Sequence, residues 1–356
     1  MKILAINPGS TSTKYAIYEG CEVLFEQTLR HSAKELSAFG SVVEQMEWRR
    51  ELIIEGVRSN GVDPLKSGEI AAVVGRGGIV KPIDGGIYGV NDTLVEDTRH
   101  ALMEHASNLG ALLARSIADA AGVNSYIVDP VVVDELEDVA RISGHPKFPR
   151  RSMFHALNSR AIAKRYASEC GKCYEELNII VVHMGGGVSV SAHKRGRVVD
   201  VNNAISGDGT FSPERAGRVE PMALAELCFS GEYTKSQVTR MLIGDGGLVA
   251  HLGSNSMYDS VQAALKGDEK AKLIVDAFCY NVAKDVGAMA TVMSGDVDAI
   301  LITGGIAQSE DIVGRITDRV KWITEVKCYA GEDELGALVG SVVEVLEGRL
   351  EPKEYI

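Results

Sequence analysis

Three glycine-containing loops in the sequence have residue types that suit the binding of phosphate groups. Residues 7–14, with the sequence NPGSTSTK, combine glycine N–H groups, four hydroxyls and one ammonium, all of which can donate to phosphate oxygens. Residues 183–187, with the sequence HMGGG, follow an apolar run, and so does the pair Gly304-Gly305. Glycine lets a backbone come close to a ligand. An ordinary polar turn would explain the first loop alone, but the three together predict a site for nucleotide phosphates.

The common signatures of other nucleotide and metal sites are absent. The sequence contains no GxxxxGK[ST] pattern, and no GxGxxG opens a helix, which disfavours a P-loop and a Rossmann dinucleotide site. Cys170 and Cys173 form a lone CxxC pair, which supplies only two of the four ligands of a structural zinc site. We interpret this pair as incidental, at the end of a helix.

The elements that must position these loops alternate between strands and helices. Residues 3–6 and 13–18 are expected strands on either side of the first loop, and 179–182 and 188–193 are their counterparts around the second. A helix is expected over 92–105. A shift of 176 residues places the first strand and its turn on the second without a gap. The pattern predicts an α/β fold made of two duplicated domains.

The expected boundary between the two domains is a polar, proline-containing stretch at residues 144–151. It separates an N-terminal α/β domain at 1–149 from a C-terminal α/β nucleotide-binding domain at 150–340. The C-terminal helix, at about 340–356, is a candidate for completing the first domain.

The net charge, the apolar runs and the cysteines exclude several classes of binding partner and location. The 356 residues carry 37 Lys and Arg against 49 Asp and Glu, a net charge of −12, which argues against nucleic acid and anionic membranes as partners. No apolar run approaches the roughly 20 residues needed to cross a bilayer. The six cysteines are scattered and no signal peptide leads the chain, so we expect a cytoplasmic protein.

Over essentially its whole length the chain resembles the acetate and butyrate kinases of the acetate kinase–sugar kinase–actin superfamily, and it looks closer to the butyrate kinases. The motifs that carry the resemblance are NPGSTSTK at 7–14, GRGG at 75–78, IVDP at 127–130, FH at 154–155, HMGGG at 183–187, FSPERAG at 211–217, TGGIA at 303–307 and EDEL at 332–335. It implies two ribonuclease-H-like domains with a cleft between them. It also implies reversible transfer of a phosphoryl group from ATP to a short-chain carboxylate, giving ADP and an acyl phosphate, with Mg²⁺ as cofactor and a homo-oligomer as the assembly.

The resemblance also implies roles for particular residues, which we carry over motif by motif. The expected catalytic residues are Asp129, His155 and Arg215. The expected substrate-binding residues are Arg76, Gly77, Gly78, Phe154 and Pro213. The expected nucleotide-binding residues are Asn7, Ser10, Ser12, Lys14, His183, Gly185, Gly186, Gly187, Gly305, Ile306 and Ala307. The expected metal ligands are Asn7, Asp333 and Glu334, and which of the two acids binds is left open.

Two hypotheses refine these roles. A carboxylic acid with a pKa near 4 is already ionised at pH 7, so Asp129 has no proton to remove, and we expect it to orient Arg76 or a metal-bound water. Acetate kinases carry two valines where this chain has Gly77 and Gly78. We expect the glycines to leave room for a longer acyl chain, which favours butyrate. The alternatives are an acetate, propionate, branched-chain carboxylate or sugar kinase, or a non-catalytic nucleotide-binding relative.

Overall fold

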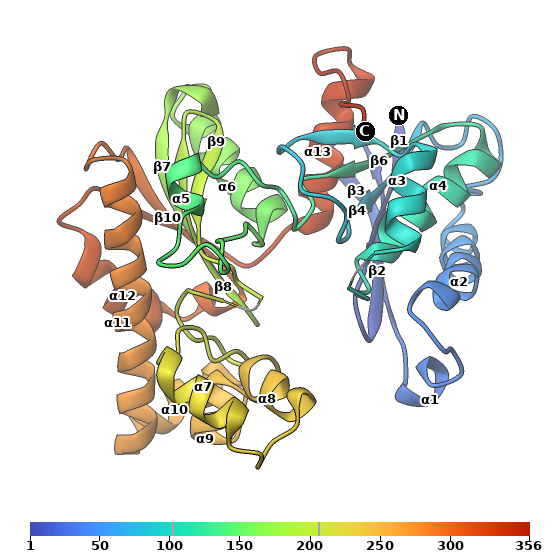
Figure 1. Cartoon of the computed structure of the whole chain (residues 1–356). Coiled ribbons are helices and arrows are strands. Elements are labelled where there is room, and N and C mark those ends of the chain that lie inside the picture. The colour runs from blue at the N-terminus through green and yellow to red at the C-terminus, as the bar shows by residue number, and fades with distance from the viewer. Residues whose placement is uncertain (102, 206) are drawn as a thin grey trace. The chain divides into compact units, whose positions relative to one another are not determined.

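The computed structural model describes residues 1–101, 103–205 and 207–356, and it divides into two compact units (Figure 1). Unit 1 comprises Met1–Val133 together with Asp333–Ile356, and unit 2 comprises Asp134–Glu332. The chain therefore divides after Val133, whereas the expected boundary lies at 149–150. The segment that returns to unit 1 begins at Asp333, ahead of the expected start near 340.

The expected boundary segment lies inside unit 2 because its side chains bond there. The Arg150 guanidinium forms an ion pair with Asp200 at 2.9 Å and donates to the carbonyl oxygen of Val201 at 3.0 Å. The backbone N–H of Glu137 donates to the carbonyl oxygen of Val199 at 3.0 Å. These bonds tie residues 137–150 to a strand of unit 2.

Unit 1 contains a six-stranded sheet in the order β3-β2-β1-β4-β6-β5. Its strands are β1 (Lys2–Pro8), β2 (Ser12–Glu19), β3 (Glu22–Arg30), β4 (Ala72–Arg76), β5 (Ile87–Gly89) and β6 (Asn124–Val128). β1, β2 and β3 form an antiparallel meander, while β1, β4 and β6 run parallel to one another. The carboxyl ends of these three parallel strands therefore meet at one edge of the sheet.

Helices cover both faces of this sheet, because its strands bury side chains on both sides. The helices of unit 1 are α1 (Ala33–Leu36), α2 (Met46–Ser59), α3 (Asp92–Arg99), α4 (Asn108–Ala121) and α13 (Glu334–Leu346), with the short 3-10 helix η1 (Val43–Gln45) before α2. Apolar residues of α2 and α4 form one core with Leu4, Ile6 and Ile17. α13 contacts β1, β4 and β6 through a buried stripe that includes Leu335 and Leu338.

The contact of α4 with β4 depends on glycine. A Cβ atom on Gly75 of β4 would lie 2.0 Å from the carbonyl oxygen of Gly110 in α4, and a Cβ on Gly110 would lie 2.0 Å from the carbonyl oxygen of Arg76. Only two residues without side chains allow the helix to lie this close to the strand. The helix expected over 92–105 ends at Arg99, and Leu102 within that range lies outside the described residues.

Unit 2 contains a five-stranded sheet in the order β11-β10-β7-β8-β9. Its strands are β7 (Asn178–Met184), β8 (Val188–Lys194), β9 (Arg197–Val201), β10 (Ala299–Gly304) and β11 (Val326–Ala330). β7, β8 and β9 are antiparallel, while β7, β10 and β11 are parallel. A shift of 176 residues places the bounds of β1 on those of β7. Five strands of the first sheet have the same order and directions as the five strands of the second, and β5 is an additional edge strand of unit 1. This correspondence confirms the duplicated α/β fold.

Helices again cover both faces of the sheet. The helices of unit 2 are α5 (Asp138–Arg141), α6 (Ala156–Glu169), α7 (Pro221–Phe229), α8 (Lys235–Leu242), α9 (Gly247–Leu252), α10 (Met257–Leu265), α11 (Glu269–Val292) and α12 (Glu310–Val320), with the 3-10 helices η2 (Tyr174–Glu176) and η3 (Gly305–Gln308). α11 and α12 pack on one face through residues such as Phe278 and Ile316. α6 packs on the other through Ala163 and Tyr166. No helix within the described ranges is long and apolar enough to cross a membrane.

Candidate active site

Three of the predicted site residues lie at the ends of neighbouring parallel strands in unit 1. Asn7 lies near the end of β1, Arg76 is the last residue of β4, and Asp129 directly follows β6. The registers pair Ile6 with Gly75 and Arg76 with Val128. The sheet therefore brings these residues to one edge, although 122 positions separate the first from the last.

Glu334 joins this group from the first turn of α13. The Arg76 Nη1 atom lies 2.8 Å from Glu334 Oε1 and 3.0 Å from Glu334 Oε2, and the Asn7 side-chain amide donates to the same carboxylate. Arg76 Nη1 also lies 3.5 Å from Asn7 Oδ1. In the part of the chain that the structure describes, no protein acceptor bonds to Arg76 Nε or Nη2. Those nitrogens leave one edge of the guanidinium available to a carboxylate ligand.

The two acids that were expected as metal ligands have different positions. The Asp333 carboxylate caps α13, where its Oδ1 accepts from the backbone N–H of Gly336 at 2.9 Å. The Glu334 carboxylate lies beside the amide of Asn7. Mg²⁺ prefers oxygen ligands and commonly takes only one or two from protein, with waters and phosphate oxygens completing its shell. Asn7 and Glu334 place oxygens of this kind side by side at the edge of the sheet, where the Glu334 carboxylate is paired with Arg76, whereas the Asp333 carboxylate caps the helix.

Asp129 is buried and its backbone is strained. Its φ is 38°, a left-handed value that costs about 1 kcal/mol or more for a residue with a side chain. Its Oδ1 accepts from the backbone N–H of Gly86 at 2.7 Å, and its own N–H donates to the carbonyl oxygen of Gly86 at 3.0 Å. The side chain is therefore held by the loop before β5. Strain of this kind often marks functional sites.

The structure contradicts the hypothesis that Gly77 and Gly78 leave room for an acyl chain. A Cβ atom on Gly77 would lie 2.6 Å from Pro130 Cβ, and a Cβ on Gly78 would lie 2.5 Å from the Cα and Oδ1 atoms of Asn108. Side chains at these positions would point into the protein itself. The two glycines are needed because the backbone after β4 packs directly against Pro130 and the start of α4.

The first loop forms the turn between β1 and β2. Ser10 lies in the turn and Ser12 begins β2. Lys14 lies opposite Asn7 in the antiparallel pair, so both side chains are on the same face of the sheet. The Lys14 ammonium forms an ion pair with Glu26 of β3 at 2.9 Å. Its charge is therefore partly balanced before any phosphate binds.

In unit 2, His183 and His155 form a stacked pair. His183 lies in β7 and is 2 % exposed, while His155 immediately precedes α6. Their ring centroids are 3.9 Å apart with an interplanar angle of 11°. His183 is hydrogen-bonded to Asn158 Oδ1 at 2.9 Å and lies 3.2 Å from Glu332 Oε1. His155 Nδ1 is hydrogen-bonded to Ser189 Oγ at 2.8 Å, so both rings are held in fixed orientations.

The glycine loop after β7 makes room for Arg215. A Cβ atom on Gly187 would lie 2.0 Å from Arg215 Nη1 and 3.2 Å from His155 Cε1. Arg215 Nη1 donates to the carbonyl oxygen of Ala204 at 2.5 Å, and burial lowers the pKa of this guanidinium, with Glu214 opposing the shift. The side chain of Arg215 therefore lies against the glycine backbone and beside the His155 ring.

The neighbouring arginine, Arg218, has a different environment. It forms an ion pair with the buried Asp285, whose pKa is raised mainly by burial, so its charge serves the packing of unit 2. Phe154 is buried next to His155. Pro213 is also buried, and its carbonyl oxygen accepts from the N–H of Val249 in α9 at 3.1 Å. A substrate-binding role for these two residues stays a prediction.

A cavity of about 590 Å³ lies next to the third glycine loop, the pair Gly304-Gly305. Gly305 and Ile306 line it, together with Ser256, Met257, Tyr258, Val261, Gln262, Leu265, Gln308, Ser309 and Asp311. Ala307 is only 4 % exposed and belongs to the apolar core under α11, so the structure differs from the prediction that placed it against a nucleotide. α10 therefore forms one wall of the cavity and η3 the other.

Sequence reasoning missed several of these residues. Asn158 and Ser189 are ordinary polar residues with no motif of their own, and Glu332 belongs to the EDEL motif but was assigned no role. Their contacts with the two histidines identify all three. Tyr258 is 71 % exposed and Leu265 63 %, which is unusual for large apolar side chains on a helix. The apolar character of α10, for which the sequence predicts no packing partner, is the signal that could have indicated this side of the cavity.

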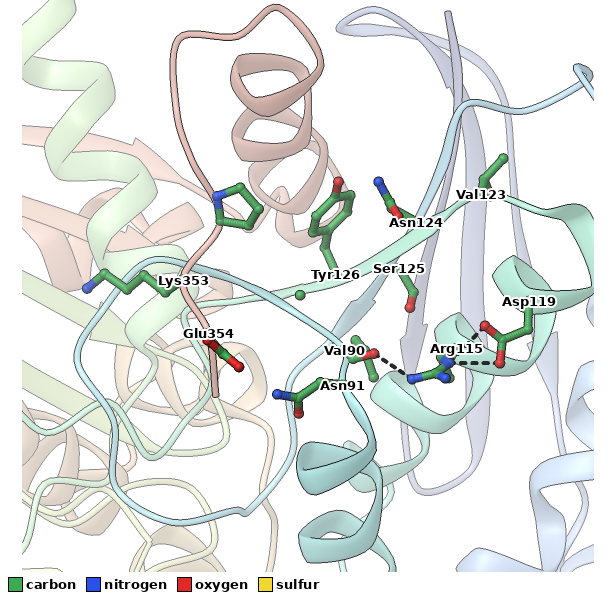
Figure 2. A pocket seen from close by; sticks show the side chains of 12 residues that line it. Val90, Asn91, Arg115, Asp119, Val123, Asn124, Ser125, Tyr126, Lys353 and Glu354 are labelled. Atoms are coloured by element: carbon green, nitrogen blue, oxygen red, sulfur yellow. Dashed lines mark hydrogen bonds and ion pairs between the residues drawn. The ribbon is translucent and has the colours of Figure 1, made fainter. Parts of the chain in front are cut away.

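A second cavity, of about 470 Å³, lies in unit 1 between the end of β5, α4 and the segment 352–354 (Figure 2). None of the predicted site residues lines it. Its Arg115 forms an ion pair with Asp119 at 2.7 Å and donates to the carbonyl oxygen of Val90, as Figure 2 shows. This cavity is therefore distinct from the sites assembled on the strand ends.

Comparison with known proteins identifies relatives of the chain in sequence and in fold. Residues 146–324 match the model of the acetokinase family. The chain is 50% identical to butyrate kinase 2 of Clostridium acetobutylicum, over 99% of both chains. The acetate kinase of Porphyromonas gingivalis has the same fold, with a TM-score of 0.79 at 19% identity over 97% of this chain and 99% of its own. A propionate kinase from Francisella tularensis gives a TM-score of 0.73 at 19% identity, over 96% and 98%. With its match to the family model and its full-length likeness to a curated relative, the chain belongs to the acetokinase family.

Proposed function

We propose that the protein phosphorylates butyrate, using ATP, to give butanoyl phosphate and ADP, in a reversible reaction. The observation that carries this proposal is the 50% identity to a butyrate kinase over 99% of both chains. Membership of the acetokinase family makes the enzyme a phosphotransferase with a carboxyl group as acceptor.

The reaction needs charge neutralisation more than proton transfer. At pH 7 the acid is ionised, since its pKa lies near 4. One carboxylate oxygen attacks the γ-phosphorus, the bond from that phosphorus to the bridging oxygen breaks, and the electron pair leaves on ADP. Arg76, whose Nε and Nη2 have no acceptor among the described residues, is proposed to hold the carboxylate. Arg215 and His155 are proposed to stabilise the charge that develops on the transferring group.

Asn7 and Glu334 are the residues proposed to hold Mg²⁺, with phosphate oxygens and waters as its other ligands. When bound, the ion would neutralise phosphate charge. The 590 Å³ cavity between α10 and η3 is proposed to receive the adenosine, because Met257, Tyr258 and Ile306 offer it apolar walls. The glycines at 185–187 are proposed to face its phosphates. We place the enzyme in the cytoplasm, where ATP is available.

We also propose that the protein self-associates through residues 218–245. In this described stretch only Val238 is buried, and α7, with the sequence PMALAELCF, contains no buried residue although most of its side chains are apolar. Phe229 is 90 % exposed and Met222 65 %. The stretch has three basic and four acidic residues in a chain of net charge −12, so two copies can meet here without strong repulsion. Its length matches the 20–30 residues per partner of a standard interface.

Self-association is tested by light scattering coupled to size-exclusion chromatography. Phe229→Asp is expected to lower the mass toward that of one chain. Trp322→Asp is the matched control, because Trp322 is also exposed, at 77 %, but lies outside this stretch. An unchanged mass for the Phe229 variant would refute this interface.

The catalytic proposal is tested with a coupled assay of ADP release over straight-chain acids of two to six carbons. We expect the highest kcat/KM with butyrate and measurable turnover with its neighbours. A maximum at acetate would favour an acetate kinase instead. Absence of turnover with every acid, in protein that still binds ADP, would favour the non-catalytic alternative.

A further inference from the structure

A buried arginine, Arg49, lies directly under the first phosphate loop. It belongs to α2 of unit 1 and is 1 % exposed. Burial lowers the pKa of its guanidinium to about 10, so it stays protonated at neutral pH. Among the residues that the structure describes, no carboxylate forms an ion pair with it, and its partners are neutral. A buried charge without a counter-ion is costly, so its presence calls for a reason.

The guanidinium bonds to the inner side of the turn between β1 and β2. Nη1 donates to the carbonyl oxygens of Gly9 at 2.9 Å and Ser12 at 3.0 Å, and Nη2 donates to that of Ser10 at 3.4 Å. The remaining carbonyl of the turn, on Thr11, accepts from the N–H of His31 at 2.8 Å. All four carbonyl oxygens of residues 9–12 are therefore held by protein donors.

Donor groups of the same turn remain available on its other side. No bond to a described residue engages the backbone N–H of Ser10 or Thr11, or the hydroxyls of Ser10, Thr11 and Ser12. An anion repels carbonyl oxygens and attracts N–H and O–H groups. A turn whose carbonyls all point inward is therefore prepared for phosphate before any phosphate arrives, which reduces the ordering cost of binding.

Neighbouring side chains fix the position of Arg49. Gln45 Oε1 accepts from its Nη2 at 2.7 Å and its Nε at 3.2 Å, and Thr13 Oγ1 accepts from its Nη1 at 2.9 Å. His31 is hydrogen-bonded to Thr13 Oγ1 at 2.8 Å and packs against Trp48, with ring centroids 4.7 Å apart. Every guanidinium nitrogen thus has an acceptor, and the cation can move little.

We propose that Arg49 is a positioning residue for the nucleotide phosphates: it turns the carbonyls of residues 9–12 inward and places an unneutralised positive charge beneath the loop. This rests on the proposed function, because it names the group that prepares this loop for the phosphates of ATP and ADP. Arg49 does not touch the nucleotide in this proposal. It acts through the turn and through its charge.

The test replaces Arg49 by lysine, which keeps the charge but offers a single nitrogen in place of the guanidinium fork. A single ammonium cannot reach the carbonyls of Gly9, Ser10 and Ser12 together. We expect Arg49→Lys to raise the KM for ATP and the Kd for ADP about tenfold, equivalent to about 1.4 kcal/mol, with the KM for butyrate unchanged. Arg58→Lys is the matched control, since Arg58 lies on the same helix, half-exposed, in an ion pair with Asp63.

Folding is measured by the fluorescence of Trp48, and binding is measured separately by calorimetry. The chain has two tryptophans, and Trp322→Phe leaves Trp48 as the sole emitter beside the Arg49 cluster. An unshifted emission maximum shows that the packing of Trp48 on His31 is intact. Calorimetric titration with MgADP then gives the affinity for ADP. If Arg49→Lys is unstable, the same titration in Arg49→Gln decides, with at least a tenfold loss expected.

A wild-type ADP affinity in either folded variant, or an equal rise in the KM values for ATP and butyrate, would overturn the role of Arg49. The outcome is independent of catalysis. If wild-type protein turned over no acid yet bound ADP, the kinase proposal would fail. The ADP titrations would still test whether Arg49 positions the phosphate loop.

Discussion

Gly187 offers a sharp test of the role of Arg215, because a single methyl group there must displace one guanidinium. The Cβ of Gly187→Ala would lie 2.0 Å from Arg215 Nη1, whereas ordinary contacts begin at 3.4 Å, so the nitrogen must withdraw by about 1.4 Å. The displaced group is the end of a flexible side chain, and the φ of Gly187 does not lie in the left-handed region. We therefore expect the variant to fold normally.

The displacement should appear in kcat. A misplacement of about 1 Å can cost roughly a hundredfold in rate, which corresponds to about 2.7 kcal/mol in the activation barrier. If Arg215 stabilises only the transition state, kcat and kcat/KM fall together while the KM values for ATP and butyrate hold. The assay is steady-state kinetics with each substrate varied in turn, with a thermal melt to verify folding.

Two other glycines serve as comparators. Gly314→Ala in α12 adds a methyl group to open space far along the chain from the loop, and wild-type kinetics are expected. Gly186→Ala adds one to open space within the loop, so it leaves Arg215 in place and should spare kcat whatever it does to the KM for ATP. A folded Gly187→Ala enzyme with kcat within about threefold of wild type would refute the assignment of Arg215 to the transition state.

Three further outcomes follow from the structure. Asp129→Asn keeps an oxygen that can accept from the Gly86 N–H but removes the negative charge, so activity should fall while the low-pH limb of the rate profile stays in place; a displaced limb would indicate a catalytic base. Gly78→Val should destabilise the fold by about 1–3 kcal/mol in urea unfolding, because its side chain meets Asn108, and a ratio of acetate to butyrate activity that rose without loss of stability would contradict this. Burial lowers the pKa of His193 from 6.5 to about 3, so the unfolded chain binds its proton first as pH falls. The free energy of unfolding should therefore decline below pH 6.5, and the contribution of His193 approaches about 1.4 kcal/mol per pH unit. Chemical unfolding at several pH values measures this decline, and His193→Gln should make it less steep.

Much of the fold could be predicted from sequence because apolar periodicity marks strands directly. The runs that flank the first two loops became β1, β2, β7 and β8, and the gap-free shift between them reflected a real duplication. Boundaries were less accurate. The segment 144–151 is polar and contains proline, yet Arg150 ties it to β9, and side-chain bonds of this kind leave no local pattern.

The site shows where local pattern stops being informative. Asp333 and Glu334 are adjacent acids of the same chemistry, and only the geometry of the helix end assigns one to a cap and the other to Asn7 and Arg76. The absence of a side chain at Gly77 was taken to leave room for substrate, although a Cβ there would meet Pro130, which follows another strand, β6. Arg49 would be expected at the surface of a helix, because arginine is rarely fully buried. Its burial depends on carbonyl groups about 40 residues away.

The return of the chain to unit 1 has a consequence for synthesis. Residues 134–332 form unit 2 as one continuous stretch, while unit 1 needs both 1–133 and 333–356. At roughly 5–20 residues per second, α13 leaves the ribosome on the order of 10–40 s after β6. During that interval the face of the sheet that α13 will cover has no helix, and Arg76 has no Glu334. The unit that begins first is thus completed last, and until then the faces of β1 and β4 that α13 covers stay open to other contacts.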